Sequence, residues 1–250
     1  PGGAPGWIYF WLCSVWGVVA IATWSWRRWK GQPPQFVGCQ RQVESVSERL
    51  GRLPCRDPAI RLLARLPGNQ ILDLETNVKT LLVPRLPPCL DGLTIVHLSD
   101  LHFTGYLTPD FFQFVVDRVN ELDGDLVAVT GDILDERSCL GWITEVLGRV
   151  ESHLGAFCIF GNHDLRIRDM PLLASEVERA GWHYVGGRWS QLRVRGQTIV
   201  VAGNELPWLG PPADMTTCPK PADGHGALRI LLSHSPDQIH WARRRGFDLM

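Results

Sequence analysis

The sequence predicts an α/β fold built on a parallel sheet and preceded by one transmembrane helix. Between residues 93 and 232, short apolar runs typical of buried strands alternate with segments of helical periodicity. Several of these runs end directly in acidic, amide or imidazole side chains, at the edge where parallel sheets collect their ligands. Residues 7 to 26 form a separate apolar stretch without a charged side chain. A chain of 250 residues with this composition is long enough to bury a core.

Composition and charge exclude some classes of function. A net charge of −1 argues against a general polyanion-binding role, so no specific nucleic-acid partner is expected. The 7 cysteines are odd in number, scattered and without a C-x-x-C pair. They therefore indicate neither a disulfide framework nor a thiolate zinc site, and a reducing compartment fits best. No particular oligomeric state is indicated.

The stretch of residues 7 to 26 predicts a membrane anchor, because about 20 apolar residues span a bilayer and aromatic residues at both ends match interfacial belts. Two alternatives are a secretory signal cleaved after Ala22 and a buried core helix. Arg27, Arg28 and Lys30 follow at once, which by the positive-inside bias puts the rest of a single-pass protein in the cytoplasm, with export as the alternative. The chain opens on Pro1 and closes on an apolar run, so truncation at both ends is expected.

Residues 31 to 70 are expected to form a basic, helical juxtamembrane linker. One helix is predicted from the spacing of Val43, Val46, Leu50 and Leu53, ending near Gly51. A second short helix opens at Asp57-Pro58 and stops at residue 67. Two interpretations stay open, in which the segment lies on anionic lipid or is a solvated linker with no special partner.

A domain with the features of an enzyme is expected from residue 71 onward. Strands are predicted at residues 71 to 74, 78 to 83 and 93 to 98, with a proline-rich connection before the last one. That last strand is followed by Asp100 and His102. In an extended chain, residues two apart face the same side, so both side chains can reach one ion.

A helix and a second buried strand come next. Thr108 and Pro109 open a helix that runs to about residue 122. Its predicted buried face is Phe111, Phe114, Val115, Val119 and Leu122. The strand at residues 126 to 130 ends in Gly131-Asp132, and Asp135 follows. Asp132 is the candidate bridging metal ligand, with ordinary turn chemistry as the alternative.

A helix near residues 140 to 150 leads to a strand at residues 156 to 160, which ends in Gly161-Asn162-His163-Asp164. Asn162 offers an amide oxygen as a neutral ligand. His163 can donate a proton or stabilise an anionic oxygen, and Asp135 is placed to orient its ring. The alternative is an Asx-turn with a surface histidine.

The last part of the chain predicts a further ligand. A helix at residues 170 to 181, a strand at 182 to 185 and a hairpin of strands 192 to 194 and 198 to 202 precede a loop or small cap at 207 to 226. The strand at residues 228 to 232 ends in Ser233-His234, and a helix follows. His234 thus has the same placement as the earlier clusters and is a candidate ligand.

In this order, the four clusters resemble those of the calcineurin-like metallophosphoesterases. An anchor followed by LPPCLDGLTIVHLSDLH at residues 86 to 102 resembles the bacterial membrane-associated branch, which includes phosphodiesterases and UDP-diacylglucosamine hydrolases. The resemblance covers roughly residues 71 to 250. It implies a four-layer α/β/β/α sandwich with two metal ions.

The resemblance also implies roles for single residues. Asp100 and His102 would hold the first metal and Asp132 would bridge. Asn162 and His234 would hold the second, with His163 and Asp135 as the catalytic pair. The family's last motif, Gly-His-x-His, is absent, and His225 is no substitute because it precedes His234 and lacks a second histidine. Truncation after residue 250 is the expected reason.

The implied activity is hydrolysis of a phosphate ester or anhydride by water that two divalent ions activate. The ligand types suit Mn, Fe, Co, Ni or Zn. A membrane anchor would favour a lipid-linked substrate such as UDP-diacylglucosamine. The rival interpretation is a binding scaffold that keeps the fold without turnover.

Overall fold

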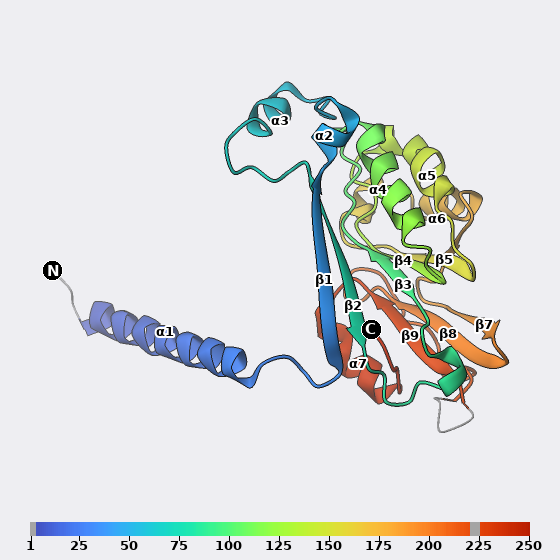
Figure 1. Cartoon of the computed structure of the whole chain (residues 1–250). Coiled ribbons are helices and arrows are strands. Elements are labelled where there is room, and N and C mark those ends of the chain that lie inside the picture. The colour runs from blue at the N-terminus through green and yellow to red at the C-terminus, as the bar shows by residue number, and fades with distance from the viewer. Residues whose placement is uncertain (1–3, 221–225) are drawn as a thin grey trace. The chain divides into compact units, whose positions relative to one another are not determined.

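Two β-sheets lie at the centre of the C-terminal part of the chain in the computed structural model, which describes residues 4–220 and 226–250 (Figure 1). The first sheet has the order β3-β4-β5-β6 and is parallel throughout. Its strands are β3 (Ile95–Leu98), β4 (Leu126–Thr130), β5 (Gly155–Ile159) and β6 (Trp182–Tyr184). The predicted parallel sheet is therefore confirmed.

The second sheet has the order β7-β8-β9. Its strands are β7 (Trp189–Val194), β8 (Gln197–Asn204) and β9 (Leu228–Ser233). β7 and β8 form the predicted antiparallel hairpin, and β9 pairs with β8 in parallel. The apolar run at the C-terminus adds one parallel bridge, between Leu249 and Ile230.

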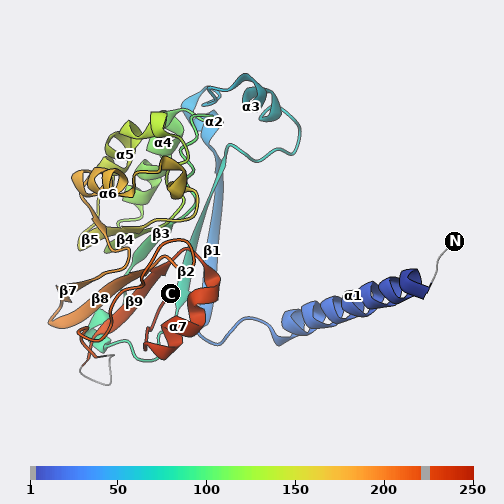
Figure 2. The ribbon, with the colours of Figure 1, turned by 180° about the vertical axis from the view of Figure 1, so that it is seen from behind.

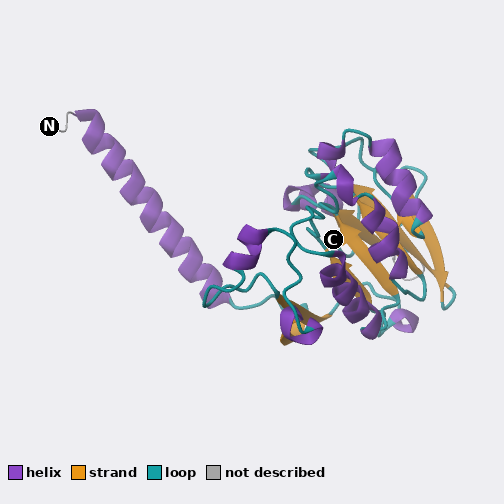
Figure 3. Cartoon of the chain, turned by 90° about the horizontal axis from the view of Figure 1, so that it is seen from above, coloured by secondary structure: helices purple, strands orange, loops and turns teal. Residues whose placement is uncertain are grey.

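Helices cover the outer face of each sheet (Figures 2 and 3). The first sheet is covered by α4 (Pro109–Glu121), α5 (Gly141–Val146) and α6 (Met170–Arg179). The second sheet is covered by α7 (Ile239–Arg244). Short 3₁₀ turns flank α5 at Arg137–Cys139 and Leu147–Arg149, so the helix expected near residues 140 to 150 is present but divided.

Alternating side chains hold these layers together, because successive residues of a strand point to opposite faces. On β4, Val127 and Val129 pack beneath the helices, whereas Leu126 and Ala128 pack against the second sheet. On β8 the odd-numbered residues face the first sheet and the even-numbered ones face α7. Three apolar cores thus separate four layers, which confirms the α/β/β/α arrangement.

The buried face of α4 differs from the predicted one. Its buried residues are Phe112, Val115, Val116 and Val119. Phe112 replaces Phe114 because its ring packs against Phe103 and Trp142, with centroids 4.7 and 6.0 Å apart. Leu122, at the end of the helix, is 39% exposed. Those ring partners come from distant segments, so the local pattern could not select the face.

The chain divides into two compact units. One comprises the residues up to Gln40 with Asn77–Leu82, and the other comprises Arg41–Thr76 with Val83–Met250. The first unit contains α1 (Ala4–Lys30). This helix is long and apolar enough to cross a membrane, and its apolar side chains from Trp7 onward are exposed.

Two long strands correct the prediction for residues 31 to 83. β1 (Phe36–Ser45) pairs with β2 (Asp73–Leu81) in a sheet of their own. The helix predicted from Val43 is wrong in its first part, because only α2 (Val46–Leu50) is helical, although it does end at Gly51. The linker is therefore not helical throughout, and the strands expected at 71–74 and 78–83 are one strand. Side chains on both strands are mostly exposed, so strand pairing rather than a buried face defines them.

Other expected elements are present. The helix opened by Asp57 is α3 (Pro58–Leu63), and the Asp57 carboxylate accepts hydrogen bonds from the backbone N–H groups of Ala59 and Ile60 at 2.7 and 3.1 Å. The seven cysteines are all free. His225, within the expected loop at residues 207 to 226, lies outside the described residues.

Candidate metal centre

The predicted site residues gather where β3, β4, β5 and β9 end. The loop after β3 runs beside the loop after β4, since Asp100 N donates to Gly131 O at 3.1 Å and His102 N donates to Asp132 O at 2.9 Å. These contacts place the first two sequence clusters next to each other. The third and fourth clusters reach the same edge through contacts with Asp132.

Three of the candidate ligands have an unusual backbone conformation. Asp100, His102 and Asp132 have φ angles of 56°, 47° and 53°. Positive φ is uncommon for residues other than glycine and carries strain that the surrounding structure must hold in place. Such strain is concentrated at functional sites, and here it falls on the side chains that the sequence analysis selected.

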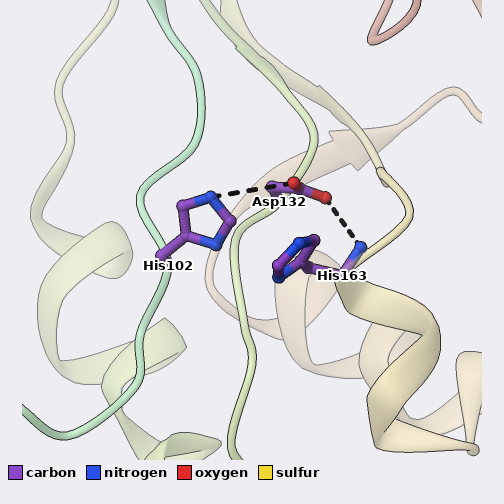
Figure 4. Close-up of side chains that lie close together, drawn as sticks. All are labelled: His102, Asp132 and His163. Carbon is purple, nitrogen blue, oxygen red and sulfur yellow. Dashed lines mark hydrogen bonds and ion pairs between the residues drawn. The ribbon is translucent and has the colours of Figure 1, made fainter. Parts of the chain in front are cut away.

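The Asp132 carboxylate lies at the centre of the cluster. It is 3% exposed, and its Oδ1 accepts a hydrogen bond from the backbone N–H of His163 at 2.8 Å (Figure 4). Its Oδ2 lies 3.7 Å from His102 Nε2 and 3.5 Å from His234 Nε2. One carboxylate therefore faces imidazoles from two different loops.

Both of these imidazoles are held by their other ring nitrogen. His102 Nδ1 donates to Asp135 Oδ2 at 2.7 Å, and His234 Nδ1 donates to the Thr130 carbonyl at 2.8 Å. A carbonyl oxygen only accepts, so the Nδ1 of His234 carries the proton and a neutral ring presents a lone pair at Nε2. This is the outer-shell arrangement of metal-binding histidines.

The Asn162 amide oxygen completes this side of the cluster. It lies 3.2 Å from His234 Nε2, so two lone-pair atoms converge there with Asp132 Oδ2 close by. Donor atoms around a tetrahedral metal ion are about 3.4 Å apart for bonds near 2.1 Å. The observed separations are close to that value, and the residues fit a divalent cation.

Two overlapping groups can each hold an ion. One is His102, Asp132 and His163, and the other is Asp100, Asp132 and His234, with the donor atoms of each group within 4.8 Å of one another. Asp132 belongs to both groups. The Asp100 carboxylate is the exposed member, 3.7 Å from His102 Nε2. The geometry thus brings all the predicted ligands together around one shared carboxylate.

Asp135 is the anchor of the imidazoles. Its buried carboxylate accepts from His163 Nδ1 at 2.6 Å as well as from His102 Nδ1. Burial alone would raise the pKa of Asp135, but the hydrogen bonds and charges of His163 and His102 outweigh it and hold that pKa below its usual range. The expected pairing of His163 with Asp135 is present. The second partner, His102, was not expected.

Sequence reasoning also missed Arg166. Its guanidinium donates to Asp135 Oδ1 at 2.5 Å, while the side chain remains 57% exposed. The only sequence signal is its position three residues after His163. A basic residue at that spacing has no distinguishing pattern, so the contact appears only in the folded chain.

The role of Asp164 was missed as well, although the residue stands in the Gly161-Asn162-His163-Asp164 string. Its fully buried carboxylate accepts the backbone N–H groups of Ile133, Leu134 and Gly161 at 3.0, 2.9 and 2.8 Å. Burial, together with the nearby Asp132 charge, outweighs the lowering effect of the three N–H groups and raises the pKa of Asp164 to about 6. Asp164 therefore ties the loop after β4 to the loop after β5.

Two glycines allow the loops to approach. Gly131 has a φ of 91°, and a Cβ there would lie 2.7 Å from Gly161 N and 2.9 Å from His234 Nδ1. A Cβ at Gly161 would overlap the Asp132 carboxylate. Both positions require the absence of a side chain for steric reasons.

Comparison with known proteins shows the family of the chain. Residues 93–248 match the family described as Calcineurin-like phosphoesterase. An uncharacterized metallophosphoesterase of Bacillus subtilis, YkuE, is 29% identical over 168 residues, which cover 66% of this chain and 58% of that protein. The Danio rerio transmembrane protein with metallophosphoesterase domain is 35% identical over 102 residues, covering 40% of this chain and 22% of that protein. The chain thus spans less than two thirds of these curated relatives.

Proposed function

Because the chain belongs to the calcineurin-like phosphoesterase family, we propose that it hydrolyses a phosphodiester or pyrophosphate bond with the help of two divalent metal ions. Asp100 and His102 would hold the first ion, and Asn162 and His234 the second. Asp132 would bridge them. The observation that supports this proposal most strongly is the Asp132 carboxylate, which both candidate ligand groups share, although those groups place Asp100 with His234 and include His163.

Carboxylate, imidazole and amide donors without thiolate suit Mn, Fe, Co, Ni or Zn. When bound, a pair of such ions polarises the phosphoryl oxygen and lowers the pKa of the attacking water. The protein contributes the positions of the donors. Nδ1 contacts direct the Nε2 atoms of His102 and His234 toward Asp132, so the donors are oriented before an ion enters.

His163 is proposed as the catalytic imidazole. Its Nδ1 donates to Asp135, which fixes the ring orientation and leaves Nε2 as the atom that can give a proton to the leaving oxygen or stabilise its charge. The rings of His102 and His163 lie edge to face with centroids 4.7 Å apart. His163 therefore stands directly beside the proposed first metal site.

The test is a metal-dependent hydrolysis assay on the full-length product of the gene that encodes this chain. A soluble chromogenic phosphodiester, bis-p-nitrophenyl phosphate, serves as substrate before chelation, after chelation and after the return of single metals. We expect turnover to disappear with the chelator and to return with at least one metal. Metal binding without turnover on any diester or pyrophosphate would favour the rival, a binding scaffold.

We further propose that the substrate is lipid-linked, as UDP-diacylglucosamine is. This proposal is supported by α1, which is long and apolar enough to span a bilayer, and by the Danio rerio relative, which is described as a transmembrane protein. In the proposed single-pass topology Arg27, Arg28 and Lys30 lie on the cytoplasmic side, together with the metal centre. Protease treatment of sealed inverted vesicles tests the orientation, because a cytoplasmic domain is digested there and an exported one is protected.

A further inference from the structure

The segment around α3 exposes apolar side chains that the chain itself does not cover. Leu62, Leu63 and Leu66 are 65%, 43% and 51% exposed, and α3 has no buried residue. Removing apolar surface from water is favourable, at about 25 cal/mol per Å². Contiguous exposed leucines therefore indicate contact with something outside the chain.

The charge of the same segment is of one sign. Residues 58–72 contain Arg61 and Arg65 and no acidic residue. Both arginines are exposed and stand among the leucines, and the Arg61 guanidinium also donates one hydrogen bond to the Cys55 carbonyl at 3.0 Å. Apolar side chains interleaved with basic ones are the composition of helices that lie in the headgroup region of anionic bilayers. Long arginine side chains can also extend toward phosphates while the neighbouring apolar groups lie deeper.

The position of this segment is fixed by backbone contacts to the metal centre's own loop. Cys55 forms an antiparallel bridge with Leu107, and Arg56 N donates to Tyr106 O at 2.8 Å. Thr108 N donates to Pro54 O at 2.9 Å. The loop that carries Tyr106 begins directly after His102. The α3 segment is therefore hydrogen-bonded to the chain that leaves a candidate metal ligand.

We propose that the α3 surface, defined as Arg61, Leu62, Leu63, Arg65 and Leu66, docks on an anionic phospholipid bilayer. The leucines enter the interfacial region and the two arginines meet lipid phosphates. Charge complementarity selects this occupant, because five neighbouring residues offer only apolar and cationic groups. For the phosphoesterase, and resting on the function proposed above, docking would hold the metal centre close to phosphates in the headgroup layer.

Hydrogen exchange on the full chain tests the docking directly. The protein is reconstituted in nanodiscs of phosphatidylcholine alone and of phosphatidylcholine with phosphatidylglycerol, and exchange is followed in the peptide that covers residues 58–72. We expect slower exchange in the anionic discs. In the anionic discs, each arginine should raise the ratio of docked to undocked α3 surface about fivefold.

Paired variants separate docking from folding. Leu62→Glu with Leu63→Glu should abolish the protection in anionic discs. Leu122→Glu, at another exposed leucine of the same unit, should leave it intact. Equal exchange in both kinds of disc would overturn the proposal. Protection that appears in lipid-free detergent and grows with protein concentration would also overturn it, because it would indicate that a second copy of the chain covers the surface.

Hydrolysis of the soluble diester is measured on the same samples. If protection is missing while soluble turnover persists, the docking proposal fails and the proposed function stands. If protection is present while no metal restores turnover, the proposed function fails and the docking stands.

Discussion

The metal-centre loops and the α3 surface differ in where their groups find partners. In the loops, the buried carboxylates of Asp132, Asp135 and Asp164 accept hydrogen bonds from neighbouring loops. On the α3 surface, three leucines remain open to solvent. The first region is held in place by the chain itself. The second exposes apolar groups that an outside partner would remove from water.

This difference separates two kinds of function. Strained ligands such as Asp132, with a φ of 53°, keep their conformation because several contacts determine it at once. Chemistry needs that rigidity, since misplaced donors lose metal affinity. A surface that docks needs exposure instead. Substitutions in the loops should therefore change turnover strongly, and substitutions in the N-terminal part should leave soluble turnover nearly unchanged.

The largest effect on turnover is expected from the imidazole. His163→Ala should reduce hydrolysis of the soluble diester about 10²- to 10⁴-fold, because the proton donor at the leaving oxygen is lost. Metal content should stay near normal. The matched control is His153→Ala, which removes another histidine paired with an aspartate, Asp123, at 2.9 Å and outside the site. If His163→Ala kept its turnover, the catalytic role would be wrong, and loss of one metal equivalent would identify it as a ligand.

A smaller effect is expected from Asp135→Asn, because the carboxylate orients two rings without touching the substrate. Mutation of an outer-shell partner of a metal ligand typically lowers metal affinity or activity about 10- to 100-fold. Since Asp135 also holds His102, the variant should weaken the first metal site as well as slow turnover. Raising the metal concentration should therefore restore part of the activity. No dependence on added metal would show that the His102 contact is unimportant.

Deleting residues 1–30 should release the protein from membranes and leave soluble turnover nearly unchanged, because every proposed ligand lies from Asp100 onward. Hydrolysis of a lipid-embedded substrate should fall much further. Both substrates, the soluble and the lipid-embedded one, are assayed on the same preparation of each protein. Equal losses on both substrates would mean that the deleted segment supports folding, and the argument for a lipid-linked substrate would be lost.

The smallest effect concerns stability against pH. Burial raises the pKa of Glu205, whose carboxylate accepts from Phe160 N and from the Tyr184 hydroxyl. The folded state thus keeps a proton that the unfolded chain has already released. The stability this gives is fully present below the unfolded pKa and is lost as pH rises through the raised folded value.

Glu205→Gln should therefore lose less stability than the parent as pH rises from acid to neutral. Urea denaturation across that pH range measures the difference, and Glu178→Gln on the exposed side of α6 is the control. A parallel pH dependence in the parent and the Glu205 variant would contradict the raised pKa.

Much of the site could be predicted from sequence because each cluster follows an apolar strand, and three of these strands are buried in the structure. Asp132 and His234 were found that way, and the structure places both at the sheet edge. Arg166 and the role of Asp164 were missed because their partners, Asp135 and the backbone N–H groups of other loops, are distant in sequence. β1 and its pairing with β2 were missed for a related reason, since exposed side chains leave no buried face to read.

The central claim is that one carboxylate serves two ions. Elemental analysis of the purified full-length protein tests it, with Asp132→Asn compared with Asp123→Asn, because both aspartates have a positive φ, 53° and 49°, and asparagine tolerates that conformation. The account predicts two metal ions per chain in the parent and in Asp123→Asn, and the loss of both in Asp132→Asn. Full two-metal occupancy in Asp132→Asn would contradict it.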